Sequence, residues 1–295
     1  MNPVAKPQTD QKTIQKSEYV LTLHCPDRVG VVSAVAGLLG QAKAFITDIS
    51  QYSDPDSRLF FSRTVFDDRE MNLSFAEFEA EMIRLGAEFE MTYILRPVLQ
   101  APRVLIAVSQ YDHCLNTLLT KWHSGALPIE IVGVVSNHKN CESMVRFYDL
   151  PFHYLPVTKE NKVAQEQVLA KLMGSADLLV LARYMQILSA GFCLDYPGQI
   201  INIHHSFLPG FKGARPYHQA HLRGVKVIGA TAHYVTPELD EGPIIVQEVR
   251  PIDHRVSVPQ MVHIGHDLEA TALATAVKLH SEERVLLNGV RTVTL

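Results

Sequence analysis

The sequence predicts two α/β domains, a small one with an antiparallel sheet and a larger one with an open, mostly parallel sheet. A chain of 295 residues is long enough for about two domains. A stretch with two prolines and no helical spacing separates two regions of different pattern. Strands and helices are predicted in the order βαββαβ before this stretch, and they alternate after it. We therefore divide the chain into a flexible tail (1–16), a first domain (17–96), a linker (97–103) and a second domain (104–295).

Composition excludes several classes of protein. The net charge of −4 provides no basic surface for nucleic acid, and no apolar run approaches the ~20 residues of a membrane span. The first fifteen residues are polar and lack the apolar core of a secretion signal, so we expect a cytoplasmic protein. The four cysteines lie far apart, and we expect free thiols rather than disulfides or zinc ligands.

The first domain has the pattern of a ferredoxin-like fold, in which helices cover one face of an antiparallel sheet. Alternating apolar residues indicate strands, and apolar residues at helical spacing indicate two helices, the second capped by Ser74. The predicted strands are 19–24, 44–52, 58–66 and 89–95, and the predicted helices are 29–41 and 74–85.

The second domain has the repeating βαβ pattern of a Rossmann-like sheet. The predicted strands are 104–108, 129–135, 153–155, 178–181, 199–203, 227–235 and 244–249. The predicted helices are 113–122, 141–148, 162–173 and 256–279. Ligands bind beyond the carboxyl ends of the strands in such sheets, so polar residues at those ends are candidate site residues.

Asn202 and His204 are the most informative of these residues. They are two apart near the end of an isoleucine-rich strand, so their side chains point to the same face. An amide donor beside an imidazole suits a reaction that develops negative charge on a carbonyl oxygen. The alternative is a turn-capping asparagine and a histidine that bonds only to the backbone.

The loop between the last two strands carries three acids among prolines and a glycine. An acid in such a loop is ordinarily a solvated turn residue. If this loop lies beside the strand that carries His204, Asp240 can instead accept a proton from the imidazole or orient a water. His263 and His266, on the last helix, are interpreted as surface or core residues rather than ligands.

In the first domain, Cys25-Pro26-Asp27-Arg28-Val29-Gly30 joins the first strand to the first helix and resembles the ACT domain, a regulatory module that often senses amino acids. The resemblance implies an amino-acid effector at Asp27, Arg28 and Gly30, and a homo-oligomer formed through this domain. Gly30 permits close approach of a ligand, and a helix N-terminus favours a carboxylate. The alternative is a helix cap with a solvated arginine and no ligand.

In the second domain, Asn202-x-His204 with Ser206-x-Leu208-Pro209, followed by the segment from His233 to Ile245, resembles the formyltransferase fold of folate enzymes. The resemblance covers about residues 103–280 and implies that Asn202, His204 and Asp240 are catalytic. It also implies that residues 181–187 receive the pterin ring, with the 237–241 loop opposite. The substrate-binding residues expected from it are Arg183, Tyr184, Met185, His205, Ser206, Leu239, Glu241 and Gly242.

Attack on the formyl group would produce a tetrahedral oxyanion that accepts hydrogen bonds from Asn202 and from protonated His204. Asp240 would stabilise the imidazolium, hold a water in line and take up or relay its proton. His204 or a water then protonates the leaving nitrogen, and the sequence leaves open which group is the formal base. This chemistry requires no metal and no cofactor beyond 10-formyltetrahydrofolate.

Water is the acceptor that the sequence favours. A phosphorylated acceptor needs a glycine-rich loop after the first strand, but residues 108–114 contain no glycine and one acid. A tRNA acceptor needs a basic surface, which an acidic chain does not provide. An ACT-like domain before a formyltransferase-like domain resembles the formyltetrahydrofolate deformylase family, which hydrolyses 10-formyltetrahydrofolate to formate and tetrahydrofolate.

The resemblance further implies a supply of formate for purine biosynthesis and a balance between one-carbon folate pools. His205 is expected beside the catalytic residues or near the incoming water. Two alternatives remain: formyl transfer to a small amine, and a folate or amino-acid sensor without catalysis.

Overall fold

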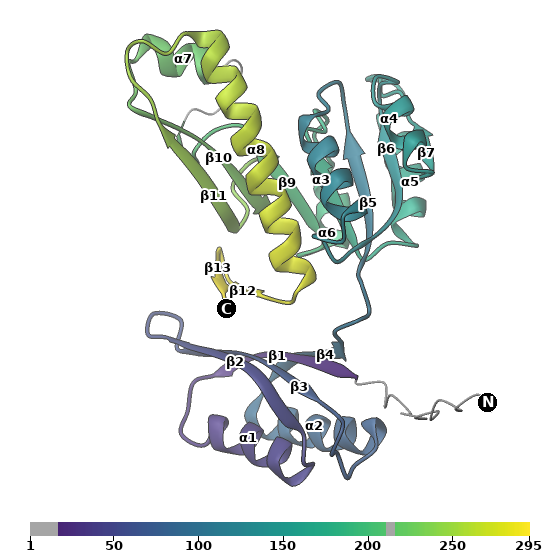
Figure 1. The fold of residues 1–295 in the computed structure, drawn as a ribbon, viewed down its shortest axis with the longest axis vertical. Coiled ribbons are helices and arrows are strands. Elements are labelled where there is room, and N and C mark those ends of the chain that lie inside the picture. The colour runs from purple at the N-terminus through teal and green to yellow at the C-terminus, as the bar shows by residue number, and fades with distance from the viewer. Residues whose placement is uncertain (1–16, 211–215) are drawn as a thin grey trace, which may run out of the picture. The chain divides into compact units, whose positions relative to one another are not determined.

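The computed structural model describes residues 17–210 and 216–295. The chain divides between Gln100 and Ala101 into two compact units, each with its own helices and sheet (Figure 1). The tail predicted at residues 1–16 lies outside the described residues.

The first unit is an antiparallel sheet with two helices. Its elements are β1 (Glu18–Pro26), α1 (Val31–Gln41), β2 (Phe45–Asp54), β3 (Leu59–Asp67), α2 (Phe75–Phe89) and β4 (Thr92–Pro97). The strands lie in the order β2-β3-β1-β4, with each neighbouring pair antiparallel. The predicted βαββαβ arrangement is confirmed.

Side chains determine where helix α2 begins and ends. Ser74 and Glu77 form a capping box at its start, as the sequence predicts for Ser74. The prediction that the last strand begins at Phe89 is wrong. Phe89 is the last residue of α2 and packs with Phe78 and Met82 in the core of this unit, and β4 begins at Thr92.

The second unit alternates strands and helices. Its elements are β5 (Arg103–Val108), α3 (His113–His123), β6 (Glu130–Ser136), α4 (Glu142–Phe147), β7 (Phe152–Tyr154), α5 (Lys162–Met173), β8 (Leu178–Ala182), α6 (Ala190–Asp195), β9 (Ile200–His204), α7 (Pro216–Leu222), β10 (Val227–Tyr234), β11 (Ile244–Pro251), α8 (Val258–Ser281), β12 (Val285–Asn288) and β13 (Arg291–Thr294). Helices α6 and α7 and the hairpin β12–β13 are absent from the sequence prediction.

Seven strands form the central sheet, in the order β11-β10-β9-β8-β5-β6-β7. Strands β5 to β9 run parallel to one another, whereas β10 pairs antiparallel with both β9 and β11. The predicted open, mostly parallel sheet is therefore confirmed, and its antiparallel edge is formed by β10 and β11.

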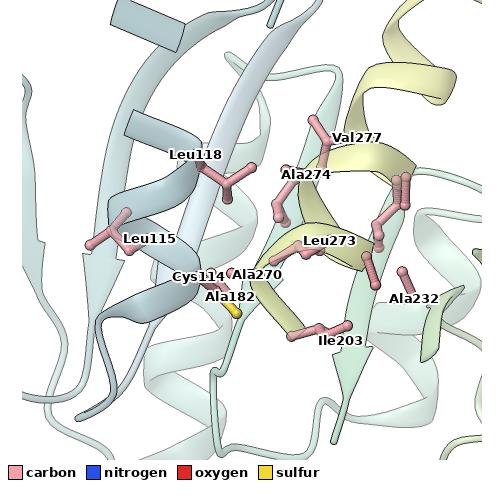
Figure 2. Close-up of a cluster of buried hydrophobic side chains, with 14 of the residues drawn as sticks. Cys114, Leu115, Leu118, Ala182, Ile203, Ala232, Ala270, Leu273, Ala274 and Val277 are labelled. Atoms are coloured by element: carbon pink, nitrogen blue, oxygen red, sulfur yellow. The ribbon is translucent and has the colours of Figure 1, made fainter. Parts of the chain in front are cut away.

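Helices cover both faces of this sheet. Leu115 and Leu118 of α3 and Leu273 and Val277 of α8 belong to one buried cluster with the strands, and Figure 2 shows these helices packed side by side in this cluster. Helices α5 and α6 contribute to a second cluster that includes β8 and the first residue of β9. A site at the strand ends is thus framed by helices on both faces.

Long helix α8 begins with a capping box between Ser257 and Gln260 and runs beside β9 and β10 (Figure 1). Its buried face is rich in alanine, so the helix approaches the sheet closely. None of the helices within 17–210 and 216–295 is long and apolar enough to cross a membrane.

Candidate active site

Strand β9 sets the direction of the two side chains predicted to be catalytic. Ile201 and Ile203 pack in the cluster with α3 and α8. Because side chains alternate along a strand, Asn202 and His204 point to the opposite face. His204 is only 5% exposed. The predicted same-face pair is thus present at the carboxyl end of a central strand.

Strand β10 supplies a third polar side chain that the sequence analysis does not assign to the site. His233 is the register partner of Asn202, and its Nε2 lies 3.2 Å from the Nδ2 of Asn202. Its Nδ1 donates to the carbonyl of Tyr234 at 2.8 Å, so in the neutral ring Nε2 is an acceptor. His233 therefore holds one N–H of the Asn202 amide and leaves the other for a ligand.

The loop between β10 and β11 brings Asp240 to these residues. Oδ2 of Asp240 lies 3.2 Å from Nδ1 of His204, and Oδ1 lies 3.8 Å from Nε2 of His233. Asp240 has a left-handed backbone (φ 57°), which is uncommon for a residue other than glycine. Close packing also requires Gly242, because a Cβ there would lie 1.8 Å from the carbonyl oxygen of Tyr234.

These contacts determine the charge of Asp240, the partner of His204. The neighbouring imidazole of His204 holds the pKa of the Asp240 carboxyl well below its usual range although burial opposes this. Asp240 is therefore ionised at neutral pH. Among the described residues, the buried Nε2 of His204 has no hydrogen-bond partner. An unsatisfied buried nitrogen is costly and marks a position for a ligand.

A pocket of about 340 Å³ is lined in part by His204. Its walls include the catalytic candidates Asn202, His204 and Asp240. They also include five predicted substrate-binding residues, Arg183, Tyr184, Met185, His205 and Leu239.

Three of the predicted substrate-binding residues do not line this pocket. The hydroxyl of Ser206 donates to the carbonyl of Gly210 at 2.8 Å, in the turn after β9. Glu241 is exposed, and Gly242 packs against the backbone of Tyr234. These residues shape the two loops rather than the pocket wall.

Arg183 and His205 lie together at the pocket. The Arg183 Nη1 donates to Nδ1 of His205 at 2.8 Å. Burial, the charge of Arg183 and the neighbouring His204 lower the pKa of His205 to about 4. His205 is therefore a neutral imidazole at physiological pH.

In the first unit, the residues predicted to bind an effector lie at the start of α1. Gly30 has φ 103° and precedes the helix. The Arg28 guanidinium donates to the carbonyl of Glu88 and lies 4.9 Å from the ring centroid of Phe89, at the C-terminus of α2. The backbone N–H of Asp27 donates to the carbonyl of Arg58 at 2.9 Å. Arg28 thus caps α2, a role that the sequence analysis does not include.

Comparisons with known proteins agree with this architecture. Residues 102–277 match the formyl transferase family and residues 19–74 match the ACT domain. The formyltetrahydrofolate deformylase of Corynebacterium sp. (strain P-1) is 46% identical over 283 residues, which cover 95% of this chain and 99% of the relative. The chain belongs to the formyltetrahydrofolate deformylase family.

Solved structures extend this result to the fold. The crystal structure of formyltetrahydrofolate deformylase from Burkholderia mallei ATCC 23344 matches with a TM-score of 0.91 and 44% identity, over 95% of this chain and 99% of that chain. Glycinamide ribonucleotide transformylase 1 from Symbiobacterium toebii matches with a TM-score of 0.62 and 28% identity, over 66% of this chain and 94% of its own. The deformylases thus match nearly the whole chain, and the transformylase about two thirds of it.

Proposed function

We propose that this chain hydrolyses 10-formyltetrahydrofolate to formate and tetrahydrofolate, with Asn202, His204 and Asp240 as catalytic residues. The observation that carries the proposal is the arrangement of the His204 ring. Its Nδ1 faces the ionised carboxylate of Asp240 at 3.2 Å, and its buried Nε2 is unpaired beside a pocket. An imidazole held in this way can carry a proton and deliver it to a bound substrate.

The reaction begins when a water attacks the formyl carbon and its proton passes to the pair of Asp240 and His204. The carbonyl oxygen becomes an oxyanion that accepts hydrogen bonds from the free N–H of Asn202 and from Nε2–H of protonated His204. Asp240 stabilises the imidazolium, because an ionised carboxylate near a buried cation favours the charged form.

Collapse of the tetrahedral intermediate breaks the bond between the formyl carbon and N10. His204, or a water that it contacts, supplies the proton that N10 requires, so tetrahydrofolate leaves as the neutral amine. The formic acid that forms loses its proton to solvent. Water and the folate are the only reactants.

The folate is proposed to lie between the segment after β8 and the β10–β11 loop. Met185 and Leu239 contribute apolar surface from the two sides, and both are more than half exposed. A bound pterin ring would cover these side chains, which favours binding by removing apolar surface from water. Tyr184 is 92% buried and belongs to the apolar cluster that contains Leu181 and Leu188 of the same segment.

Water rather than a phosphorylated acceptor is supported by the loop after β5. The Ser109 hydroxyl donates to Asn137 at 2.6 Å and accepts from the backbone N–H of Met185 at 3.0 Å. This hydroxyl is therefore committed to joining three loops. Asp112, immediately before α3, adds a negative charge that opposes a phosphate at that helix.

The first unit is proposed to regulate this activity by binding an amino acid at Asp27, Arg28 and Gly30, and to join copies of the chain. The chain is proposed to act in the cytoplasm and to supply formate for purine biosynthesis. Allostery requires a measured coupling between the two sites. If Arg28→Ala leaves every change of activity by amino acids intact, the proposed effector site is wrong.

The experiment incubates the purified protein with 10-formyltetrahydrofolate and no added acceptor. Formate and tetrahydrofolate should appear in equal amounts, and Asp240→Asn should slow the release of both by about 10² to 10⁴-fold. Turnover only after addition of an amine would replace hydrolysis by formyl transfer. Tight folate binding with no turnover under either condition would replace it by a sensing function.

A further inference from the structure

A buried polar cluster lies behind the pocket and is centred on Glu269, a fully buried residue of α8. Its Oε2 lies 2.8 Å from Nε2 of His113 and 3.3 Å from Nε of Arg183. Its Oε1 accepts from the hydroxyl of Tyr217 at 3.0 Å. Gly265 leaves room for this tyrosine, because a Cβ there would lie 1.9 Å from the hydroxyl oxygen. Side chains from other segments thus surround the carboxylate, with hydrogen bonds to His113 and Tyr217 and an ion pair to Arg183. The Arg183 Nε itself has no hydrogen-bond partner among the described residues.

This cluster borders the apolar core of the second unit. Cys114, Ala182 and Ala270 belong to one buried cluster and lie close together in Figure 2. They are the sequence neighbours of His113, Arg183 and Glu269, respectively. The three polar side chains therefore project from three segments that pack together in the core. A buried charge at this position is tolerated only when it is paired.

A metal ion does not explain the cluster. His113, Cys114 and Glu269 present ligand atoms within 4.8 Å of one another. However, burial raises the pKa of the Cys114 thiol well above its usual range, so the thiol stays protonated. Arg183 is also a permanent cation beside the same carboxylate and would repel a metal ion. The guanidinium already provides the positive charge that Glu269 needs.

Arg183 connects the cluster to the pocket. Its backbone is left-handed (φ 61°), a conformation that a non-glycine residue keeps only when its surroundings hold it. The same guanidinium that pairs with Glu269 donates from Nη1 to Nδ1 of His205 at 2.8 Å. A guanidinium cannot accept a hydrogen bond, so Nδ1 of His205 is unprotonated and the neutral ring carries its proton on Nε2.

His205 is also the ring next to the catalytic imidazole. The centroids of His204 and His205 are 5.0 Å apart and the rings are stacked. Two imidazolium ions at this distance would repel each other, so a proton on one ring disfavours a proton on the other. A residue that sets the charge of His205 therefore also affects the charge of His204.

We propose that Glu269 is a positioning residue: through Arg183 it holds His205 as a neutral imidazole, so that of the two adjacent rings His204 alone takes up the catalytic proton. Four charged or titratable groups face His205. Arg183 and His204 favour its neutral form, whereas Glu269 and Asp240 oppose this. Burial, followed by the charge of Arg183, whose Nη1 donates to Nδ1 of His205, decides the balance in favour of the neutral ring. Only the predicted change in kcat rests on the proposed function. The predicted protonation of His205 does not depend on it.

The test combines nuclear magnetic resonance and kinetics on the full chain labelled with ¹⁵N-histidine. In the unsubstituted protein, His205 should be neutral with its proton on Nε2 from pH 5 to pH 8. Glu269→Gln removes the charge that holds Arg183, and should release its hydrogen bond and allow a proton on Nδ1 of His205. The accompanying loss in kcat should be on the order of 10²-fold, the size expected when a reacting group is misplaced.

Two further variants keep the proposal falsifiable. Arg183→Met removes the connecting donor and should also allow a proton on Nδ1 of His205. The double variant with Glu269→Gln leaves no unpaired buried charge, so it tests the same connection if either single variant does not fold. The double variant should lose no more activity than either single variant, because both act through one connection. Tyr217→Phe is the matched control: it removes one hydrogen bond to Glu269 and should lower Tm while the protonation of His205 and kcat stay unchanged.

An unchanged His205 spectrum in Arg183→Met, or in Glu269→Gln, would overturn the proposal whatever happens to kcat. Additive losses in the double variant would also overturn it. If the unsubstituted protein releases no formate, the proposed function fails. The spectra would still show whether Glu269 and Arg183 control the protonation of His205, so the two failures are distinguishable.

Discussion

Nδ1 of His204 lies 3.2 Å from Oδ2 of Asp240, a contact that joins the end of β9 to the β10–β11 loop. It fixes the ring so that Nε2 is the nitrogen left for substrate. Strands β9 and β10 are antiparallel, so the loop that follows β10 starts beside Ile201, near the beginning of β9. The loop must fold back along β9 for Asp240 to reach His204, so the contact depends on the path of this loop.

Asp240→Asn should lower kcat by about 10² to 10⁴-fold, the usual contribution of a positioned acid–base group. The amide keeps the shape of the side chain but removes the charge that stabilises the imidazolium. Asp253→Asn is the matched control, because Asp253 also has a lowered pKa, caused by Arg255, and lies in the loop after β11. Initial rates with 10-formyltetrahydrofolate should be unchanged in the control; equal losses in both variants would contradict the role of Asp240.

Asn202→Ala should lower kcat by about 10² to 10³-fold with little change in KM, because the donor acts mainly on the oxyanion. Steady-state kinetics separate the two constants. A large rise in KM with unchanged kcat would show instead that the amide binds the ground state.

His233→Phe should lower kcat by less than Asn202→Ala, because it releases the Asn202 amide without removing it. His233 holds Nδ2 of Asn202 at 3.2 Å. The double variant should be no slower than Asn202→Ala alone if His233 acts through this amide. A double variant that is much slower would assign His233 a separate role, for instance at Asp240.

Gly242→Ala should destabilise the protein by about 1–3 kcal/mol or more and remove most activity, because the new methyl group would overlap the carbonyl of Tyr234. The strain falls on the loop that carries Asp240. Gly191→Ala, in α6, is the control, since a Cβ there meets no atom within 4 Å. Thermal unfolding and initial rates should separate the two variants, and equal Tm values would contradict the close approach at Gly242.

Stability should fall as pH decreases from about 6.5 to about 4, and His205 should contribute to this fall. The pKa of His205 is about 4 in the folded protein and 6.5 in a model peptide, so the unfolded chain binds more protons in this window. The contribution is fully present above 6.5, and about 3 kcal/mol is lost at pH 4. Denaturant unfolding of His205→Gln, compared with the unsubstituted protein, should show a flatter pH dependence between these limits.

The lowered pKa of Asp240 affects the stability of the protein at a lower pH than the pKa of His205 does. Its stabilisation is present above the usual carboxylate value of 3.8 and is lost below it, so it does not account for a change between pH 4 and pH 6.5. Parallel curves for His205→Gln and the unsubstituted protein in that window would show that His205 is not held neutral.

The strands and the position of Asn202 and His204 on one face could be predicted because their signals are local. Asn202 and His204 are two residues apart among isoleucines, and this spacing alone places them on one face. His233 could not be assigned in the same way. Its role depends on pairing opposite Asn202, and the register between two strands is not set by either strand alone.

Glu269 lies within the segment 256–279, which the sequence predicts as a long packing helix. The available signal is an acid between Leu268 and Ala270 on the buried face, since a buried charge requires a partner. Its partners Arg183 and His113 come from distant segments, and only the folded chain identifies them. The early end predicted for α2 has a similar cause, because Phe89 extends the helix by packing in the core.

The most direct test of the account is hydrolysis of 10-formyltetrahydrofolate in ¹⁸O-labelled water without any added acceptor, with mass analysis of the formate. Attack by water predicts one ¹⁸O atom in each formate and an equal amount of tetrahydrofolate, both released about 10² to 10⁴-fold more slowly by Asp240→Asn. Unlabelled formate, or release of tetrahydrofolate without formate, would contradict water as the nucleophile at Asn202, His204 and Asp240.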